Sequence, residues 1–413
     1  LQETPTVEIS FPFTIRNQFV SSMATLKAAV KNKKLLYGYQ NDFFKKSMQK
    51  AGSSKIKGYV FGDRYDKNRN KAFIDVLLKH QIEVYPLGSD ASFNGKSYKA
   101  GSSYVVPTYQ KQYYMVQSLF ETYEKYRDSV YYDTSAWSMV NFYNMNPGQL
   151  AKLPTTGEKM TWENNKVGTD RIPESTYAYL IPYDDYYAPA YLYHMLDKGI
   201  VVKTSTKPFS ARIGGEVMDF RRGSLMVPVA EQSEKVRNKL NETLNKLSEE
   251  FSVQAYSVNT GFTVKGNGLG SRSFLTVEKP KVMMVVEGTI SSYEAGEVWH
   301  LFENRMKMPV TKVPERLFYR TELDRYNVII LVSGTYKLMN DREKERLKKW
   351  VADGNTLITA ARASSWLVKQ KLVDEKLVSS NDSLAEQKRM DYADSRNSIG
   401  KQNLGGAIFG IDL

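Results

Sequence analysis

The stretch "KVMMVVEGTISSYEAGEVWHLFENRMKMPVT", residues 281–311, passes from an apolar run into a segment with a helical period. Its first apolar run predicts a buried strand, and residues 292–306 then follow a helical period. The alternation continues in three further segments: an apolar run at 326–334, a helix-like segment at 340–354 and another strand at 355–361. Such regular alternation predicts an α/β fold with a parallel, doubly wound sheet.

The same alternation occurs upstream, so we expect flavodoxin- or Rossmann-like parallel sheets in two or three domains. A strand at 58–61, a helix opened by Asp66 and a strand at 82–87 form one strand–helix–strand unit. We predict four parts: a lead-in (1–15), a first α/β unit with a long N-terminal helix (16–145), a second α/β unit (146–279) and a last domain (280–413) truncated at its C-terminus. The start at Leu1 and the apolar end favour a piece cut from a larger protein.

Composition limits the classes of function. Of the 413 residues, 41% are hydrophobic and 25% charged, as in folded soluble proteins, and no apolar run approaches the roughly 20 residues that span a bilayer. The net charge of +13 arises from 58 basic and 45 acidic residues that are interspersed, without a recognition motif, so we expect no nucleic-acid partner. The absence of cysteine excludes disulfides, thiolate metal sites and cysteine nucleophiles.

His-x-x-Glu, a spacing at which zinc carboxypeptidases hold their metal, occurs at His80 and again at His300. A helical wheel over 292–306 places His300 on the polar face, opposite Ala295, Trp299, Leu301, Phe302 and Met306. A catalytic zinc needs three protein ligands, and the third histidine, His194, lies among packing residues. We therefore expect no metal site and no other cofactor in this chain.

The segment "TAARASSWL", 359–367, lies at a strand-to-helix turn, where hydrolases of this architecture carry their nucleophile. The turn offers alanines, with Ser364 and Ser365 one step later, and no histidine follows. A Ser-His-Asp arrangement in the usual chain order is therefore excluded, and we predict no catalytic residue.

The remaining candidates are contact residues in loops. In α/β sheets, ligands bind beyond the carboxyl ends of strands, and Tyr-rich loops with carboxylates suit peptides or sugars. The first candidate loop contains Tyr183, Asp184, Asp185, Tyr186 and Tyr187. The second group contains Glu287, Ser291, Tyr293, Glu294, His300, Ser333 and Gly334. For the first loop, an equally simple interpretation is that an aspartate caps the next helix while the tyrosines pack locally.

Several segments together resemble a known arrangement. They are "YDTSAW" (132–137), "PYDDYYAPAYLYHMLDKGIVVKTSTKPF" (182–209), "RRGSLMVPV" (221–229), "LGSRSFLTVEKPKVMMVVEG" (269–288) and "SSYEAGEVWHLFENRMKMPVT" (291–311). They are similar to the region that follows the catalytic domain in large secreted zinc metallocarboxypeptidases of the carboxypeptidase A-like family from Bacteroidetes-type bacteria. Residues from about 281 onward resemble the class I glutamine amidotransferase-like domain that ends such proteins.

The resemblance implies a parent enzyme that removes C-terminal residues from peptides, with zinc confined to its catalytic domain. It implies a non-catalytic accessory role for this chain in substrate presentation, domain packing or protein–protein contact. The implied partners are the carboxypeptidase domain and other cell-envelope proteins, and the implied location is exported. Alanines replace the amidotransferase cysteine, which argues against glutamine hydrolysis. The alternative is a peptide- or glycan-binding module without enzymatic activity.

Overall fold

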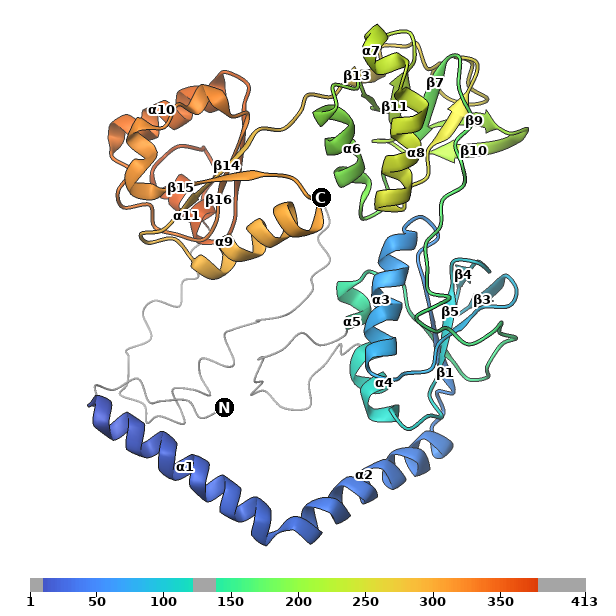
Figure 1. Cartoon of the computed structure of the whole chain (residues 1–413), viewed down its shortest axis with the longest axis vertical. Helices are drawn as coiled ribbons and strands as arrows, with labels where there is room; N and C mark the ends of the chain where they lie inside the picture. Colours follow the sequence, from blue (N-terminus) through green and yellow to red (C-terminus); the bar gives the residue numbers. More distant parts are fainter. Residues whose placement is uncertain (1–9, 122–138, 378–413) are drawn as a thin grey trace. The chain divides into compact units, whose positions relative to one another are not determined.

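The computed structural model describes residues 10–121 and 139–377. It is a mixed α/β structure with several sheets (Figure 1). Two compact units divide the chain, with the boundary after Lys166. Parts of the predicted lead-in and last domain, and the segment 132–137, lie outside the described ranges.

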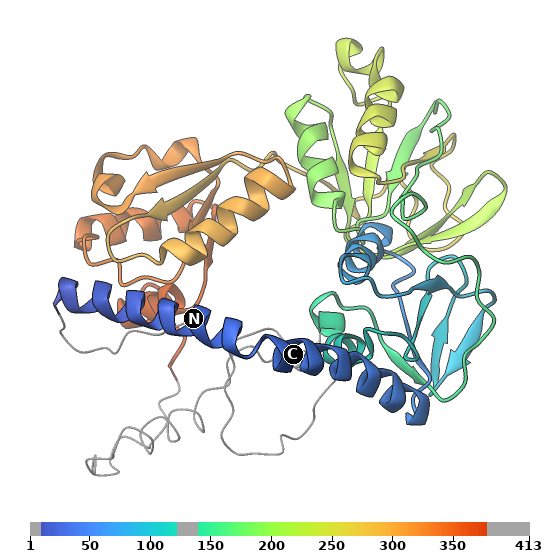
Figure 2. The ribbon, with the colours of Figure 1, turned by 60° about the horizontal axis from the view of Figure 1, so that its bottom comes forward.

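Two long helices begin the described chain, where the sequence predicted one long N-terminal helix. They are α1 (Phe11–Lys31) and α2 (Lys33–Ser53). The end of α2 attaches to the first unit: Ser47 and Ala51 are buried, and the Phe43 ring lies 5.1 Å from that of Tyr114 in α4 (Tyr113–Phe120). No residue of α1 is buried, and Figure 2 shows it as a single straight helix.

The first sheet has the order β2-β5-β1-β6 and is antiparallel at every pairing. Its elements are β1 (Gly58–Phe61), α3 (Lys67–Lys79), β2 (Tyr85–Pro86), β5 (Tyr104–Pro107), α5 (Met139–Phe142) and β6 (Gly148–Leu150). Asp66 caps α3 as predicted, accepting from the Arg69 backbone N–H at 2.8 Å. Because β6 pairs with β1, this unit extends past the predicted boundary at residue 145.

The prediction of a parallel sheet is wrong for this unit. Strands β1 and β2 run in the same direction, as a strand–helix–strand unit requires, but β5 lies between them and is antiparallel to both. Hydrophobic periodicity predicts that strands exist, but it does not predict which strand enters between two others.

The second sheet repeats this arrangement, with the order β12-β7-β11-β8-β13 and only antiparallel pairings. Its elements are β7 (Ala178–Ile181), α6 (Ala188–Asp197), β8 (Lys203–Ser205), β11 (Leu225–Pro228), α7 (Glu234–Arg237), α8 (Leu240–Phe251), β12 (Tyr256–Val258) and β13 (Phe274–Thr276). Here β11 lies between β7 and β8, so the parallel prediction is wrong for this sheet too. Both sheets are built from a split β-α-β unit.

Each sheet also has a hairpin inserted before the strand that enters the middle. The hairpins are β3 (Ala91–Phe93) with β4 (Lys96–Tyr98), and β9 (Phe209–Ile213) with β10 (Glu216–Phe220). Their two-residue turns, Asn94-Gly95 and Gly214-Gly215, all have positive φ, which matches the twist of a tight hairpin. The chain therefore contains two copies of one topology.

A buried glutamine occupies the same place in both copies. In the first, Gln110 Oε1 accepts from the Glu83 backbone N–H at 2.8 Å, and its Nε2 donates to the Pro107 carbonyl at 2.6 Å. In the second, Gln232 Oε1 accepts from the Val201 N–H at 2.9 Å. Its Nε2 donates to the carbonyls of Pro228 at 2.8 Å and of Val201 at 2.9 Å. We call this set of hydrogen bonds the glutamine clamp, and it ties the end of the middle strand to the chain entering its neighbour.

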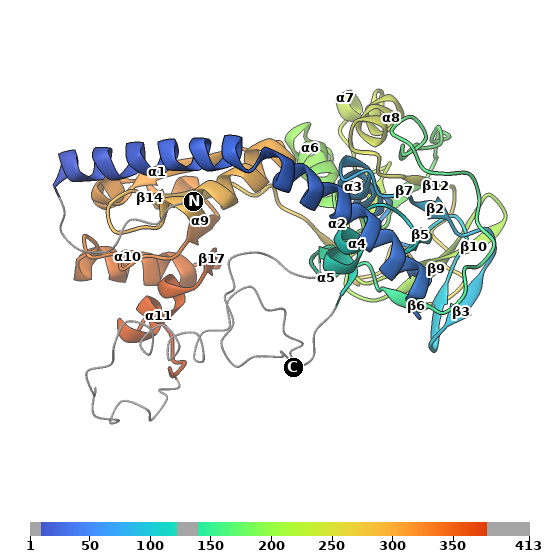
Figure 3. The same cartoon turned by 90° about the horizontal axis from the view of Figure 1, so that it is seen from below.

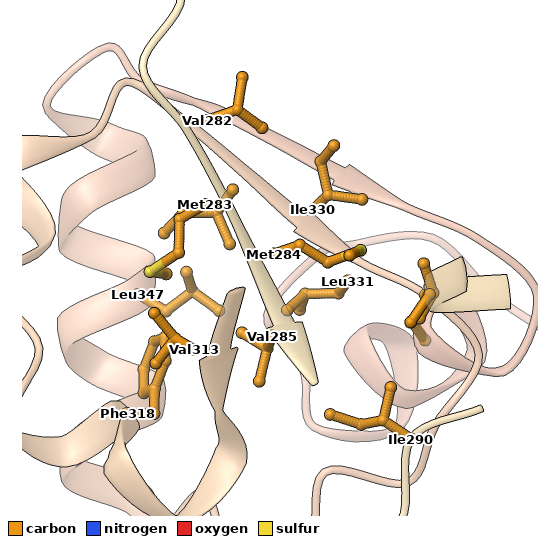
Figure 4. Packing of buried hydrophobic residues seen from close by; sticks show 14 of the residues in the cluster. Val282, Met283, Met284, Val285, Ile290, Val313, Phe318, Ile330, Leu331 and Leu347 are labelled. Carbon is orange, nitrogen blue, oxygen red and sulfur yellow. The ribbon is translucent and has the colours of Figure 1, made fainter. Parts of the chain in front are cut away.

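The last described part contains the parallel sheet that the opening stretch predicts, with the order β15-β14-β16-β17. The strands are β14 (Val282–Val286), β15 (Val310–Pro314), β16 (Val328–Leu331) and β17 (Thr356–Thr359). The helices are α9 (Ser292–Trp299), α10 (Asp341–Ala352) and α11 (Arg362–Lys369), with a π-helix η1 (His300–Arg305) and 3-10 helices η2 (Glu315–Arg320) and η3 (Leu323–Arg325). Figure 4 shows Met283 and Val285 of β14 among side chains from the neighbouring elements, in one buried apolar cluster.

The π-helix corrects the predicted wheel at its end. The Met306 backbone N–H donates to the Leu301 carbonyl five residues earlier, at 3.0 Å, so the register changes after Trp299. Leu301, in the π-helix, is exposed, and so is Trp299 at the end of the regular helix before it, although the regular wheel placed both toward the core. His300 is exposed as predicted.

Candidate functional site

The site predicted in the last domain lies at the carboxyl edge of the parallel sheet, where the loops after β14 and β16 adjoin. The Ser291 backbone N–H donates to the Ser333 carbonyl at 2.8 Å, and an isolated β-bridge pairs Ile290 with Gly334. A Cβ on Gly334 would lie 3.0 Å from Ile290 Cγ1, so a larger residue would push the loops apart. The structure thus brings Ser291, Ser333 and Gly334 together at the carboxyl ends of two neighbouring parallel strands.

Glu294 joins the same two loops. Its Oε2 accepts from the Ser333 N–H at 2.7 Å, while Ser291 Oγ accepts from the Glu294 N–H at 3.4 Å and caps α9. Each of these polar groups is occupied by a neighbour within the edge. We therefore assign Ser291 and Glu294 a positioning role in the loop structure.

Glu315 is a buried carboxylate that the sequence interpretation missed. It is 2% exposed, and its Oε1 accepts from the Leu338 N–H at 2.9 Å. In the part of the chain that the structure describes, Oε2 has no hydrogen-bond partner and faces Gly288, where a Cβ would lie 2.6 Å away. Glu315 directly follows β15. A position just after a strand was the one sequence feature that could have identified Glu315 as a candidate site residue.

Tyr336 closes the edge from inside. Its side chain is buried and its hydroxyl donates to the Val332 carbonyl at 2.6 Å. Burial, with the nearby Glu315 and Glu294 carboxyls, raises the pKa of this tyrosine above its usual value. The phenol therefore stays protonated and serves as a hydrogen-bond donor.

Three other predicted residues, Glu287, Tyr293 and His300, lie outside the hydrogen-bonded group formed by Ser291, Glu294 and Ser333. Tyr293 is 85% exposed and His300 is exposed on the helix surface. Glu287 has a φ of 67° and lies 3.7 Å from the Arg316 guanidinium. Of these, Tyr293 alone presents a large free apolar surface.

The turn from β17 into α11 has the geometry of a nucleophile elbow. Ala361, the residue before α11, has φ 49° and ψ −119°, a conformation that L residues rarely adopt. The Ala360 N–H donates to the Leu331 carbonyl at 3.0 Å, which holds the turn against β16. Ser364, the nearest hydroxyl considered from the sequence, lies 2.9 Å from Thr359 Oγ1. The residue at the apex is therefore an alanine, without a nucleophilic atom.

Most side chains of the loop before α6 are engaged by nearby residues. Asp184 pairs with Arg221 at 3.1 Å, and Asp185 Oδ1 accepts from the Tyr187 N–H at 2.9 Å. Asp185 forms a turn just before α6, because the helix begins after Tyr187 and has no side-chain cap. Tyr186 and Tyr187 make an edge-on contact at 5.0 Å.

Tyr183 is the remaining member of this loop. Its side chain is 37% exposed, and burial of the rest raises the pKa of its phenol. The local-packing interpretation of the loop therefore accounts for most of its contacts.

The three histidines have different surroundings. His80 follows the last residue of α3, and His194 stacks on Phe251 at 5.0 Å. Across residues 10–121 and 139–377, no group of three His, Asp or Glu side chains is placed to hold a metal ion. Within these ranges there is also no helix long and apolar enough to cross a membrane.

Comparison with known proteins gives no relative: no family model, no curated protein and no solved structure matches this chain.

Proposed function

We propose that this chain is a non-catalytic accessory region of an exported zinc carboxypeptidase, with a last domain like a class I glutamine amidotransferase. In this proposal, the parent enzyme removes C-terminal residues from peptides and holds zinc in its own catalytic domain. The segments at 182–209, 221–229 and 269–311, which resemble the post-catalytic region of such enzymes, motivate the assignment.

The non-catalytic part of the proposal rests on the alanine at position 361. An elbow presents its apex residue to substrate, and the turn between β17 and α11 has that strained form with a methyl group at the apex. The polar groups nearby at the carboxyl edge, Glu294 and Ser333, hydrogen-bond each other across the loops. This arrangement supports a contact or packing role.

The proposal is tested with the purified chain, supplied with zinc and incubated with peptides that have different C-terminal residues. We expect no release of C-terminal residues above the buffer rate, and no ammonia from glutamine in a parallel assay. Release in proportion to the concentration of the chain, and abolished by a chelator, would show that this region is a peptidase in its own right.

The alternative, a peptide- or glycan-binding module, has less support. Asp185 and Tyr187 have partners inside their own loop, and Asp184 pairs with Arg221 after β10. Tyr293 is the one predicted aromatic contact residue that is mostly exposed.

A further inference from the structure

Helix α1 presents a stripe of apolar side chains to solvent. The stripe consists of Phe11, Ile15, Phe19, Met23, Leu26 and Val30, which recur every three or four residues and so lie along one side of the helix. Each is exposed, from 38% for Met23 to 78% for Val30. Figure 3 shows α1 followed directly by α2, whose far end is attached to the first unit. A stripe of this length is the kind of face that another element covers.

Charge around the stripe is one-sided. At 100° per residue, Arg16, Lys27 and Lys31 all fall about 60° to 120° around the helix from Phe19, on a single flank. The opposite flank carries Gln18 and Thr25, and the first acidic residue after Ser10 is Asp42. The stripe therefore has one border that carries the basic residues together with the exposed Phe13 and Val20, and one neutral border.

We propose that the α1 stripe docks on another protein domain, on a helix or groove whose apolar line is bordered on one side by Asp or Glu. An amphipathic helix laid in an apolar groove uses anchors at this spacing. Complementary charge on the matching flank would fix the direction of docking. This inference does not depend on the carboxypeptidase assignment.

Two other occupants fit the stripe less well. A second copy would bring only positive charge, since residues 11–41 contain five Lys or Arg and no acidic residue, and like charges side by side disfavour pairing. Helices that lie in a membrane surface are rich in Lys and Arg across their polar face. In α1 the face opposite the stripe has only uncharged residues, including Ser21 and Ala28.

The test uses the full chain and a fluorescent synthetic helix with a leucine stripe and glutamates along one flank. The comparison peptide has lysines in place of the glutamates. We expect the chain to bind the glutamate peptide at least about tenfold more tightly, and Phe19→Ser with Leu26→Ser to weaken that binding by about tenfold or more. Gln18→Ser with Thr25→Ser, two changes on the neutral border that remove no apolar anchor and no charge, should change it less than about twofold. All four side chains are exposed, so folding is preserved, and circular dichroism checks this.

A charge reversal tests the flank separately. Arg16→Glu with Lys27→Glu should reverse the preference, so that the lysine peptide binds more tightly. The proposal is overturned if neither peptide binds, if both bind equally, or if the reversal changes nothing. It is also overturned if the chain binds phosphatidylglycerol vesicles while ignoring the peptides, or if sedimentation shows dimers that the Phe19→Ser and Leu26→Ser changes dissociate.

Discussion

Ala361 lies at the apex of the turn between β17 and α11, in backbone geometry that costs of order 1 kcal/mol or more for an L residue. It is exposed, and it directly precedes the N-terminus of α11. The N-terminus of a helix favours negative charge. The position therefore has surroundings that would activate a nucleophile, but the alanine side chain has no nucleophilic atom.

A single thiol at this position reports on those surroundings. Because the chain has no cysteine, Ala361→Cys introduces the one thiol in the molecule. We expect its pKa to lie below the usual value and its reaction with a disulfide reagent at pH 7 to be about tenfold faster than that of Ala352→Cys. Ala352 is exposed at the C-terminal end of α10, where the helix dipole disfavours a thiolate. Equal rates in the two variants would contradict the elbow assignment.

Gln81 allows a second test on a single residue, because the equivalent position in the second copy of the topology is a glycine. It follows α3 with φ 57°, and its counterpart after α6 is Gly199, with φ 74°. In both copies the next backbone N–H donates back to the helix, from Ile82 to Leu77 and from Ile200 to Met195. A left-handed conformation disfavours a residue with a Cβ, so Gln81→Gly should raise the free energy of unfolding by about 1 kcal/mol.

Urea unfolding measures this change, and Gly199→Gln should shift stability by a similar amount in the opposite direction. A loss of stability in Gln81→Gly would show that the glutamine side chain contributes more than its backbone conformation costs.

At the scale of elements, the glutamine clamp links a strand end to the segment that enters the neighbouring strand. Both β5 and β11 end at a proline, whose carbonyl the glutamine amide satisfies. The segment before β8 has its backbone N–H and C=O at Val201 satisfied by Gln232. The clamp thus stabilises the strand order in which β5 lies between β1 and β2, and β11 lies between β7 and β8.

Removing a clamp should be costly in both copies. Gln232→Ala leaves buried backbone groups without partners, and we expect a loss of about 2 kcal/mol. Gln110→Ala should show a loss of similar size, and hydrogen exchange should quicken at Val201 or Glu83 respectively. Gln149→Ala, at an exposed position of β6, is the matched control and should change little. Unchanged exchange at both amides would show that the clamp does not hold these segments.

At the scale of the whole molecule, periodicity and capping predicted most helices and the apolar strands such as β14 and β16, but not the two hairpins, β15 or the pairing of strands. Asp66 before α3 and Asn340 before α10 are capping residues as their sequences indicate, and Asn340 forms a full capping box with Glu343. The first two sheets are antiparallel because β5 and β11, each of which follows a hairpin, insert between two earlier strands. No local sequence pattern indicates where a later strand will insert. The parallel sheet of the last part was predictable in outline because its central strands, β14 and β16, are continuous apolar runs, whereas the edge strand β15 (VTKVP) was missed.

The candidate site was predictable only in outline. Strand ends indicated Ser291, Glu294 and Ser333, which the structure joins, because loops after adjacent parallel strands meet at one edge. Glu315 was missed, since its burial depends on the fold of the whole edge. Tyr293 and His300 were grouped with that edge from their distance along the chain, but α9 and the start of η1 carry both to the surface.

In the proposed function, the metal chemistry of the parent enzyme lies outside this chain. The most direct test is the zinc content of the purified chain after equilibration with zinc and removal of free metal, measured by mass spectrometry. We expect substoichiometric zinc, with no difference between the chain and a His80→Ala, His194→Ala, His300→Ala variant. One zinc per chain, lost in that triple variant, would contradict it.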